Sequence, residues 1–187
     1  MAAALTGLIA VGLSGGCAGS TTAKLVTPTD TPDSVAAESC TPVESFTNGG
    51  REHVADGTDV DDYNSEPPTS GPHYATPADP GLYSSALPEE QLVHNLEHGQ
   101  IVIYFSPAIP EEMISELQEL VASDPVGLLA VPYEAAASPT EIILTAWTHL
   151  QRCDGFSPQD IDAFRSEFEG RGPENVGVPP FDSGDSA

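Results

Sequence analysis

The chain has 187 residues, which is enough for one ordinary domain with tails and too short for two well-filled hydrophobic cores. It carries 29 acidic residues against only 5 basic ones, and its formal net charge is −24. A field of this sign repels the phosphates of DNA and RNA, so we expect no nucleic-acid partner. The acidic residues are spread along the whole chain, which favours a solvated acidic surface.

The first residues have the pattern of an export signal. Residues 2–19 contain no charge, and Leu5–Leu13 forms an apolar core that is too short to span a bilayer as a helix. Small residues then precede Cys17 and resemble the lipobox, where a signal peptide is cut and the new N-terminal cysteine is lipidated. We therefore expect a signal peptide at 1–17, with a lipid anchor on Cys17 at the extracellular face of the cell membrane. A secretory peptide cleaved without lipidation is the alternative. The usual basic residues before the apolar core are missing, so either the true start lies upstream of Met1 or the export signal is atypical.

Composition divides the rest of the chain into a spacer, a domain and a tail. Residues 18–39 are rich in Thr, Ser, Pro and Ala and predict a spacer that holds the domain away from the membrane. Residues 172–187 predict a disordered tail, which leaves a single globular domain at 40–171. Within it, Cys40 and Cys153 can form a disulfide in an oxidising compartment. Two free thiols, one of them a soft metal ligand, are the alternative.

The first part of the domain is expected to be rich in loops. The proline-rich stretch Glu66–His73 favours turns and extended backbone. Pro88, followed by two glutamates, favours the start of a helix, which should run to His98 because Gly99 supplies a C-terminal stop. The apolar, β-rich run Ile101–Phe105 then has the pattern of a buried strand.

Two further helices and two strands complete the expected elements. Pro110 begins a helix with one apolar face, and a Ser-Pro cap begins the last helix at 157–168. Leu128–Val131 and Ile142–Trp147 predict strands, and the loop between them suits a hairpin. This order of elements predicts an α/β fold, with α+β as the alternative. We expect a small mixed β-sheet with packed helices, partly thioredoxin-like and preceded by a loop-rich segment.

Two histidines and a glutamate share one face of the first predicted helix. His94 and His98 are four residues apart and Glu97 lies between them, so the three side chains can point the same way. Imidazoles at this spacing suit zinc, copper or nickel, and a further ligand must then come from elsewhere in the fold. His73 is a candidate, because the proline-rich stretch before it is rigid enough to hold one side chain in place.

Other interpretations of the same residues remain open. Each histidine can be structural, because His98 lies where it serves the helix dipole and His94 can hydrogen-bond a backbone group beneath the proline-rich loop. The spacing His-x-x-Glu-His also occurs in inverted zinc proteases, whose glutamate acts as general base on a zinc-bound water. In a hydrolase of this kind, Glu97 would be catalytic.

Five short motifs together point to a family. They are, in chain order, Gly50–Val54, Pro67–His73, Gly81–Tyr83, Val93–Gly99 and Thr145–Trp147. The set resembles the domain-of-unknown-function family 3105 (DUF3105), found in exported or membrane-anchored proteins of bacteria and archaea. One departure is Thr148, since glycine is expected after the tryptophan. The family carries no established activity. The resemblance implies that one constellation contains His53, His73, His94, Glu97 and His98.

We therefore expect a metal-binding module that holds copper or zinc through His73, His94 and His98. His53 or Glu97 would be a fourth ligand or a group that orients a ligand. A non-catalytic alternative is a hydrogen-bonded structural domain that docks on an envelope protein. A zinc-dependent hydrolase is the weakest of the three hypotheses.

Overall fold

The computed structural model describes residues 40–174 and 176–182. The expected signal peptide, the lipidation site Cys17 and the spacer at 18–39 lie outside the described residues. Within the described part of the chain, no helix is both long and apolar enough to cross a membrane.

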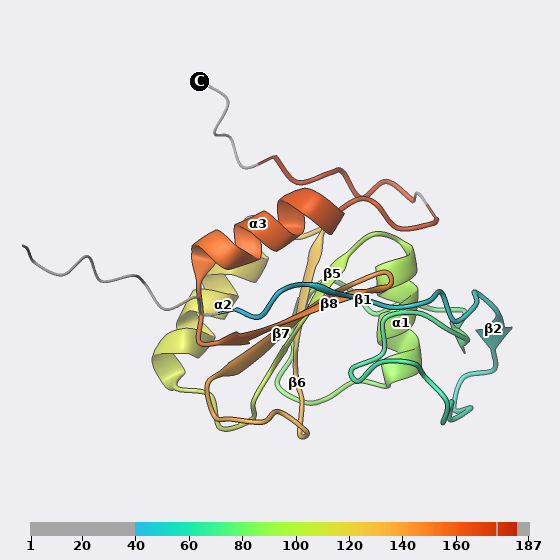
Figure 1. Cartoon of the computed structure of the whole chain (residues 1–187), viewed down its shortest axis with the longest axis horizontal. Coiled ribbons are helices and arrows are strands. Elements are labelled where there is room, and N and C mark those ends of the chain that lie inside the picture. Colours follow the sequence, from blue (N-terminus) through green and yellow to red (C-terminus); the bar gives the residue numbers. More distant parts are fainter. Residues whose placement is uncertain (1–39, 175, 183–187) are drawn as a thin grey trace, which may run out of the picture. The chain divides into compact units, whose positions relative to one another are not determined.

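The described domain is built on a six-stranded sheet with three helices and a separate two-stranded sheet (Figure 1). Along the chain the elements are β1 (Glu44–Ser45), β2 (His53–Val54), β3 (His73–Tyr74), β4 (Gly81–Leu82), α1 (Glu89–Glu97), β5 (Ile101–Phe105), α2 (Glu111–Ser123), β6 (Leu128–Pro132), β7 (Glu141–Ala146), β8 (His149–Asp154) and α3 (Pro158–Phe168). The strand order of the large sheet is β1-β8-β7-β5-β6-β4, and β2 pairs with β3.

Strand β5 lies inside the large sheet and explains its mixed character. It runs parallel to β6 and antiparallel to β7, and all of its residues are buried. A strand that is covered on both faces needs apolar side chains in both directions, which is why Ile101–Phe105 is continuously apolar. The prediction of an α/β fold with a mixed sheet and packed helices is confirmed.

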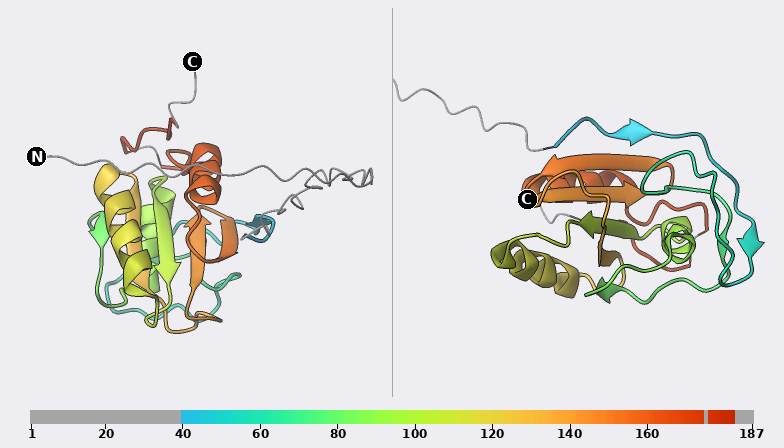
Figure 2. Two further views of the ribbon diagram at one scale, coloured as in Figure 1. Left: turned by 90° about the vertical axis from the view of Figure 1, so that its left-hand side faces the viewer. Right: turned by 90° about the horizontal axis from the view of Figure 1, so that it is seen from below.

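Helices cover both faces of the sheet. On one face, Ile101, Ile103 and Phe105 pack in a core with side chains of α2 and α3. On the other face, Val102 and Tyr104 pack with apolar residues of α1. Figures 1 and 2 accordingly show α1 on the opposite side of the sheet from α2 and α3. The histidine-bearing helix is therefore fixed against the sheet by its apolar side.

The predicted hairpin between the strands at 128–131 and 142–147 is wrong. These segments form β6 and β7 as expected, but β5 lies between them in the sheet. Strand β7 instead forms a hairpin with β8, which we did not predict. Only Leu150 and Cys153 of β8 are buried, so the strand lacks a clear apolar pattern. The turn of the hairpin contains Thr148, with φ of 64°.

The disulfide between Cys40 and Cys153 is confirmed. The two residues are 113 positions apart in sequence, and the bond joins the start of the domain to β8. Strand β1, which follows Cys40, pairs antiparallel with the same strand. The covalent bond and the strand pairing therefore hold the N-terminal segment at one edge of the sheet.

Part of the segment that we expected to be a disordered tail packs on the domain. The backbone N–H of Glu174 donates to the carbonyl of Glu97 at 3.0 Å, and Val178 is buried. The guanidinium of Arg165 lies 3.8 Å from the ring centroid of Phe181. The described C-terminal residues thus extend the packed domain past residue 171.

Candidate metal centre

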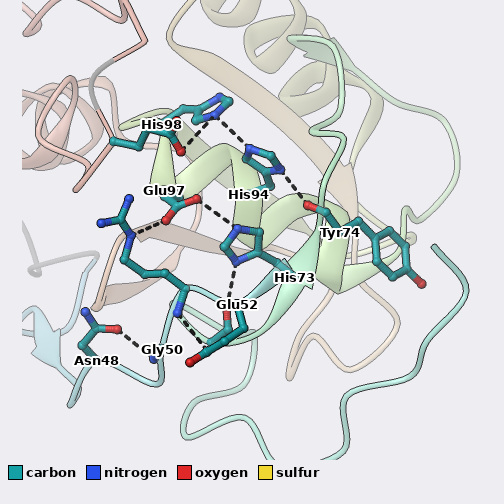
Figure 3. A network of polar contacts seen from close by, with 11 residues as sticks. Asn48, Gly50, Glu52, His73, Tyr74, His94, Glu97 and His98 are labelled. Carbon is teal, nitrogen blue, oxygen red and sulfur yellow. Dashed lines mark hydrogen bonds and ion pairs between the residues drawn. The ribbon is translucent and has the colours of Figure 1, made fainter. Parts of the chain in front are cut away.

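The last turn of α1 carries three of the candidate ligands. Pro88 precedes the first turn of this helix, and the helix ends at Glu97, with His98 as its C-terminal cap. Gly99 follows with φ of 89°, a conformation that glycine adopts readily. His94, Glu97 and His98 therefore lie on one side of the helix end, as the sequence spacing predicted (Figure 3).

The two-stranded sheet brings two more histidines to the same place. In the parallel pairing of β2 with β3, His53 lies directly beside His73. The backbone N–H of His73 also donates to the carbonyl of Glu52 at 3.0 Å. His53 and His73 are twenty positions apart in the sequence, and this register places them next to each other. Strand β3, which carries His73, contacts α1.

The proline-rich loop holds His73 from the other side. Gly71 has φ of 140°, and a Cβ atom there would clash with the ring of Tyr63. The hydroxyl of Tyr63 donates to the carbonyl of Pro72 at 2.6 Å. Since His73 is fully buried, this loop fixes the position of an imidazole that has no freedom to turn outward.

The imidazole rings form a compact cluster. The ring centroids of His53, His73 and His94 are 5.0–5.1 Å from one another. The ring of His98 lies 4.4 Å from that of His94. The structure thus brings together the four histidines that the motifs singled out.

Backbone carbonyls set the tautomers of two rings. The Nδ1 atom of His73 lies 2.8 Å from the carbonyl oxygen of Gly71, and Nδ1 of His94 lies 2.7 Å from that of Tyr74. A carbonyl only accepts, so each Nδ1 carries the hydrogen and donates it. In the neutral ring, Nε2 then presents a lone pair. This is the arrangement in which proteins commonly hold metal-ligating histidines.

Both Nε2 atoms face other electron-rich groups. Nε2 of His73 lies 3.0 Å from Oε2 of Glu97, and Nε2 of His94 lies 2.9 Å from Nε2 of His98 (Figure 3). Between Nε2 of neutral His73 and an ionised carboxylate there is no hydrogen to share. A proton or a cation must therefore lie between these two groups.

Burial opposes the charged form of the histidines on α1. It lowers the pKa of His94, with the neighbouring rings of His98, His73 and His53 adding to the effect, although the hydrogen bond to Tyr74 acts in the opposite direction. Burial also lowers the pKa of His98. Both rings therefore favour the neutral state, which is the state that binds a metal ion.

Glu97 is ionised although it is buried. Burial alone raises the pKa of its carboxyl, but the hydrogen bond from Arg51 and the nearby ring of His73 outweigh this, and the pKa is lowered. Nε of Arg51 donates to Oε1, which leaves Oε2 facing His73. The cluster thus contains a carboxylate oxygen directed at its imidazoles.

Within the described residues these side chains form two groups suited to a metal ion. One ligand atom from each of His53, His73, His94 and Glu97 lies within 4.8 Å of every other in the first group. The second group consists of His94, His98 and Glu174, under the same limit. Together the two groups contain the five residues that the sequence predicted, which are His53, His73, His94, Glu97 and His98. The first group, however, contains His53 in place of His98, which we expected beside His73 and His94.

Two residues of the site were missed by the sequence analysis. Arg51 lies within the motif Gly50–Val54 and is one of only five lysine and arginine residues, and this rarity could have marked it as a functional residue. Glu174 lies in a glycine- and proline-rich segment that has no periodic pattern, so nothing in the sequence marked it. Its position depends on how the C-terminal segment packs on the end of α1.

The fifth histidine of the chain has a separate environment. His149 stacks on Phe168 with ring centroids 4.3 Å apart, and its Nδ1 atom lies 2.8 Å from the carbonyl oxygen of Trp147. It belongs to neither of the two groups. His149 therefore offers a matched control for substitutions within the cluster.

The comparison with known proteins agrees with the motifs. The family model described as "Protein of unknown function (DUF3105)" matches residues 53–179, which begin with His53 and include Glu174. No curated protein and no solved structure matches the chain significantly. The match covers more than half of the chain and contains every residue of the two groups, and the chain belongs to the DUF3105 family.

Proposed function

We propose that this domain binds one copper or zinc ion through His53, His73, His94 and Glu97. The observation that carries the proposal is the convergence of one ligand atom from each of these residues within 4.8 Å. Two of the rings are already oriented by backbone carbonyls, so that their Nε2 lone pairs are available. A bound cation would also remove the repulsion between His73 and the carboxylate of Glu97.

The ligand types favour copper or zinc over harder ions. Imidazole nitrogens suit zinc and copper, whereas calcium and magnesium prefer an all-oxygen environment. A set of three histidines and one carboxylate matches the four-coordinate preference of zinc. The net charge of −24 adds a field that attracts cations to the surface of the protein.

We further propose that the domain acts outside the cell, held at the membrane by a lipid on Cys17. The small residues before this cysteine and the spacer at 18–39 support this location. The disulfide between Cys40 and Cys153 also supports it, because disulfides persist mainly in oxidising compartments.

Elemental analysis of the purified full chain tests the proposal. The chain is incubated with copper or zinc, freed of excess metal, and compared with a His73→Ala/His94→Ala variant. We expect about one ion per wild-type chain and none in the variant. A His149→Asn variant is the control, because it removes an imidazole outside the cluster and should keep the ion. Absence of bound metal in the wild type would contradict the proposal.

A second candidate is a structural domain that docks on an envelope protein. The observation in its favour is Arg51, which supplies a positive charge to Glu97 without any metal. In that case the same double substitution should lower the melting temperature and leave the metal content unchanged. The wild-type chain should also co-purify with a membrane complex.

The geometry does not favour the hydrolase hypothesis. A general base must be free to accept a proton from a metal-bound water. Oε1 of Glu97 accepts a hydrogen bond from Arg51, and Oε2 faces Nε2 of His73 within the proposed set of metal ligands. We therefore do not propose a catalytic role for this residue.

A further inference from the structure

His94 belongs to both groups of potential ligands. The first group contains His53, His73, His94 and Glu97, and the second contains His94, His98 and Glu174. Because Nδ1 of His94 donates to Tyr74, only its Nε2 atom is available to a metal. One nitrogen lone pair binds one ion at a time, so the two groups cannot be filled together through His94.

We propose that one ion occupies two alternative positions, and that His94 is the ligand common to both. The inner position is the group with His53, His73 and Glu97, and the outer position is the group with His98 and Glu174. The ion would load through the outer position and pass to the inner one while it stays bound to His94. This inference rests on the proposed function and adds a route by which the ion is taken up.

The outer position is the more accessible of the two. In the outer group, two of the three ligands are open to solvent, since the side chains of Glu174 and His98 are 43% and 16% exposed. In the inner group His53 is exposed, but the other three ligands are buried, and the side chains of His73 and Glu97 are only 0% and 2% exposed. His98 also lines a surface cavity of about 300 Å³, together with Pro125 and Val178. An ion in solution can therefore reach His98 and Glu174 without any movement of the buried side chains.

Charge also distinguishes the two positions. The inner group has the guanidinium of Arg51 on one oxygen of its carboxylate, so an arriving cation meets a positive charge there. In the outer group, the carboxylate of Glu174 lies 3.9 Å from Nε2 of His98 and has no ion pair with an arginine within the described residues. The outer position attracts a cation more strongly at first contact, and the inner one offers more imidazoles once the ion has arrived.

Glycines hold Glu174 in the outer position. The N–H of Gly170 donates to the carbonyl of Gly99 at 2.8 Å, and that of Glu174 donates to the carbonyl of Glu97 at 3.0 Å. Between them, Gly172 lies so close to α1 that an added Cβ would collide with the carbonyl oxygen of Glu97. The C-terminal segment therefore positions its glutamate through a backbone contact that only glycine allows.

Rapid-mixing experiments on the full chain test the inference. Trp147 is the only tryptophan of the chain and its ring centroid lies 6.4 Å from that of His73, so its fluorescence should report copper in the inner position. We expect a His98→Asn/Glu174→Gln variant to load Cu²⁺ about tenfold more slowly than wild type. At equilibrium it should still bind about one ion per chain, because the inner ligands remain.

Two further variants separate position from charge. A His149→Asn/Glu167→Gln variant removes the same two residue types outside both groups and should load at the wild-type rate. Gly172→Ala keeps all ligands but displaces the segment that bears Glu174, and should slow loading as well.

The outcomes distinguish this inference from the proposed function. A wild-type loading rate in the His98→Asn/Glu174→Gln variant, with one ion bound, would overturn the inference and leave the proposed function intact. Two ions per wild-type chain at saturation would overturn the shared use of His94. A wild-type chain that binds no copper would overturn both proposals.

Discussion

His73 presents its Nε2 atom to Oε2 of Glu97 at 3.0 Å while its Nδ1 atom donates to the backbone of Gly71. Since both residues are buried, the unfavourable contact between a lone pair and a carboxylate is not relieved by water. A proton on His73 can relieve it, and so can a bound cation. The protein therefore contains a preformed site in which the carboxylate of Glu97 and the Nε2 atom of His73 need a positive charge between them.

Arg51→Gln should lower the melting temperature of the metal-free chain more than that of the metal-loaded chain. Without metal, Arg51 is the main positive partner of the Glu97 carboxylate. A bound ion would supply positive charge in its place, so the loss of the guanidinium should then matter less. Thermal melting followed by circular dichroism, with and without zinc, measures both effects. Arg171→Gln is the control, because Arg171 lies outside the cluster, and an equal drop in both forms would contradict the prediction.

Glu169→Gln should change the dependence of stability on pH. Burial raises the pKa of the Glu169 carboxyl from 4.5 to about 7, and the carboxyl of Asp124 adds to this although Arg165 acts against it. The folded state therefore binds more protons than the unfolded state between these two values. The contribution of Glu169 to stability is present below pH 4.5 and is lost as the pH rises towards 7. The glutamine of the variant stays neutral at every pH, so the variant does not lose this contribution to stability.

The difference between variant and wild type is the quantity to measure here. The lowered pKa values of His94 and His98 make the wild-type stability rise with pH in an overlapping range, which is the opposite sign. Urea unfolding at a series of pH values should show that the unfolding free energy of the Glu169→Gln variant increases relative to that of the wild type from pH 4.5 to about 7. The exposed neighbour Glu167→Gln should show no such gain. A constant difference for Glu169→Gln across this range would refute the assignment.

Removal of the disulfide should destabilise the domain substantially. Cys40 and Cys153 are 113 positions apart in the sequence, so the bond removes much of the conformational freedom of the unfolded chain. We expect Cys40→Ala/Cys153→Ala to lose about 2–5 kcal/mol of unfolding free energy, as is typical of native disulfides. Urea unfolding measures the loss, and the wild type under reducing conditions should behave like the variant. Identical unfolding midpoints for the variant and the oxidised wild type would rule out this role.

Thr148→Gly should stabilise the hairpin between β7 and β8. Thr148 has φ of 64°, which is unfavourable for a β-branched residue, and the motif comparison led us to expect glycine there. Relief of this strain exceeds the entropic cost of glycine by up to about 1 kcal/mol. Thermal melting should show an increase for Thr148→Gly and a smaller one for Thr148→Ala. A lower melting temperature for the glycine variant would show that the hydroxyl contributes more than the strain costs.

Much of the fold could be predicted because its central elements have strong local patterns. The proline starts of α1 and α2, the apolar run of β5 and the Ser-Pro cap of α3 each reflect a local physical requirement. Strand β8 was missed because only Leu150 and Cys153 point into the core. We assigned the hairpin to the wrong pair of strands, β6 and β7. In the sheet β5 lies between these two strands, and that order depends on pairing between segments that are distant in sequence.

In the candidate site, too, only the contacts between residues close in sequence could be predicted. His94, Glu97 and His98 were grouped correctly because helical spacing fixes their common face. That His53 lies beside His73 depends on the register of β2 with β3, which only the family resemblance suggested. Glu174 could not be predicted, since its place follows from the close packing of Gly172 on the end of α1.

X-ray absorption spectroscopy of the metal-loaded full chain identifies the atoms that bind the ion. We predict nitrogen and oxygen ligands at about 2.0–2.1 Å from the ion, with the scattering pattern of several imidazoles. A His53→Ala variant should lose one imidazole from that pattern, because His53 belongs to the inner group. An ion surrounded only by water and carboxylate oxygens, with a spectrum unchanged by His53→Ala and His73→Ala, would contradict a metal site built from these histidines.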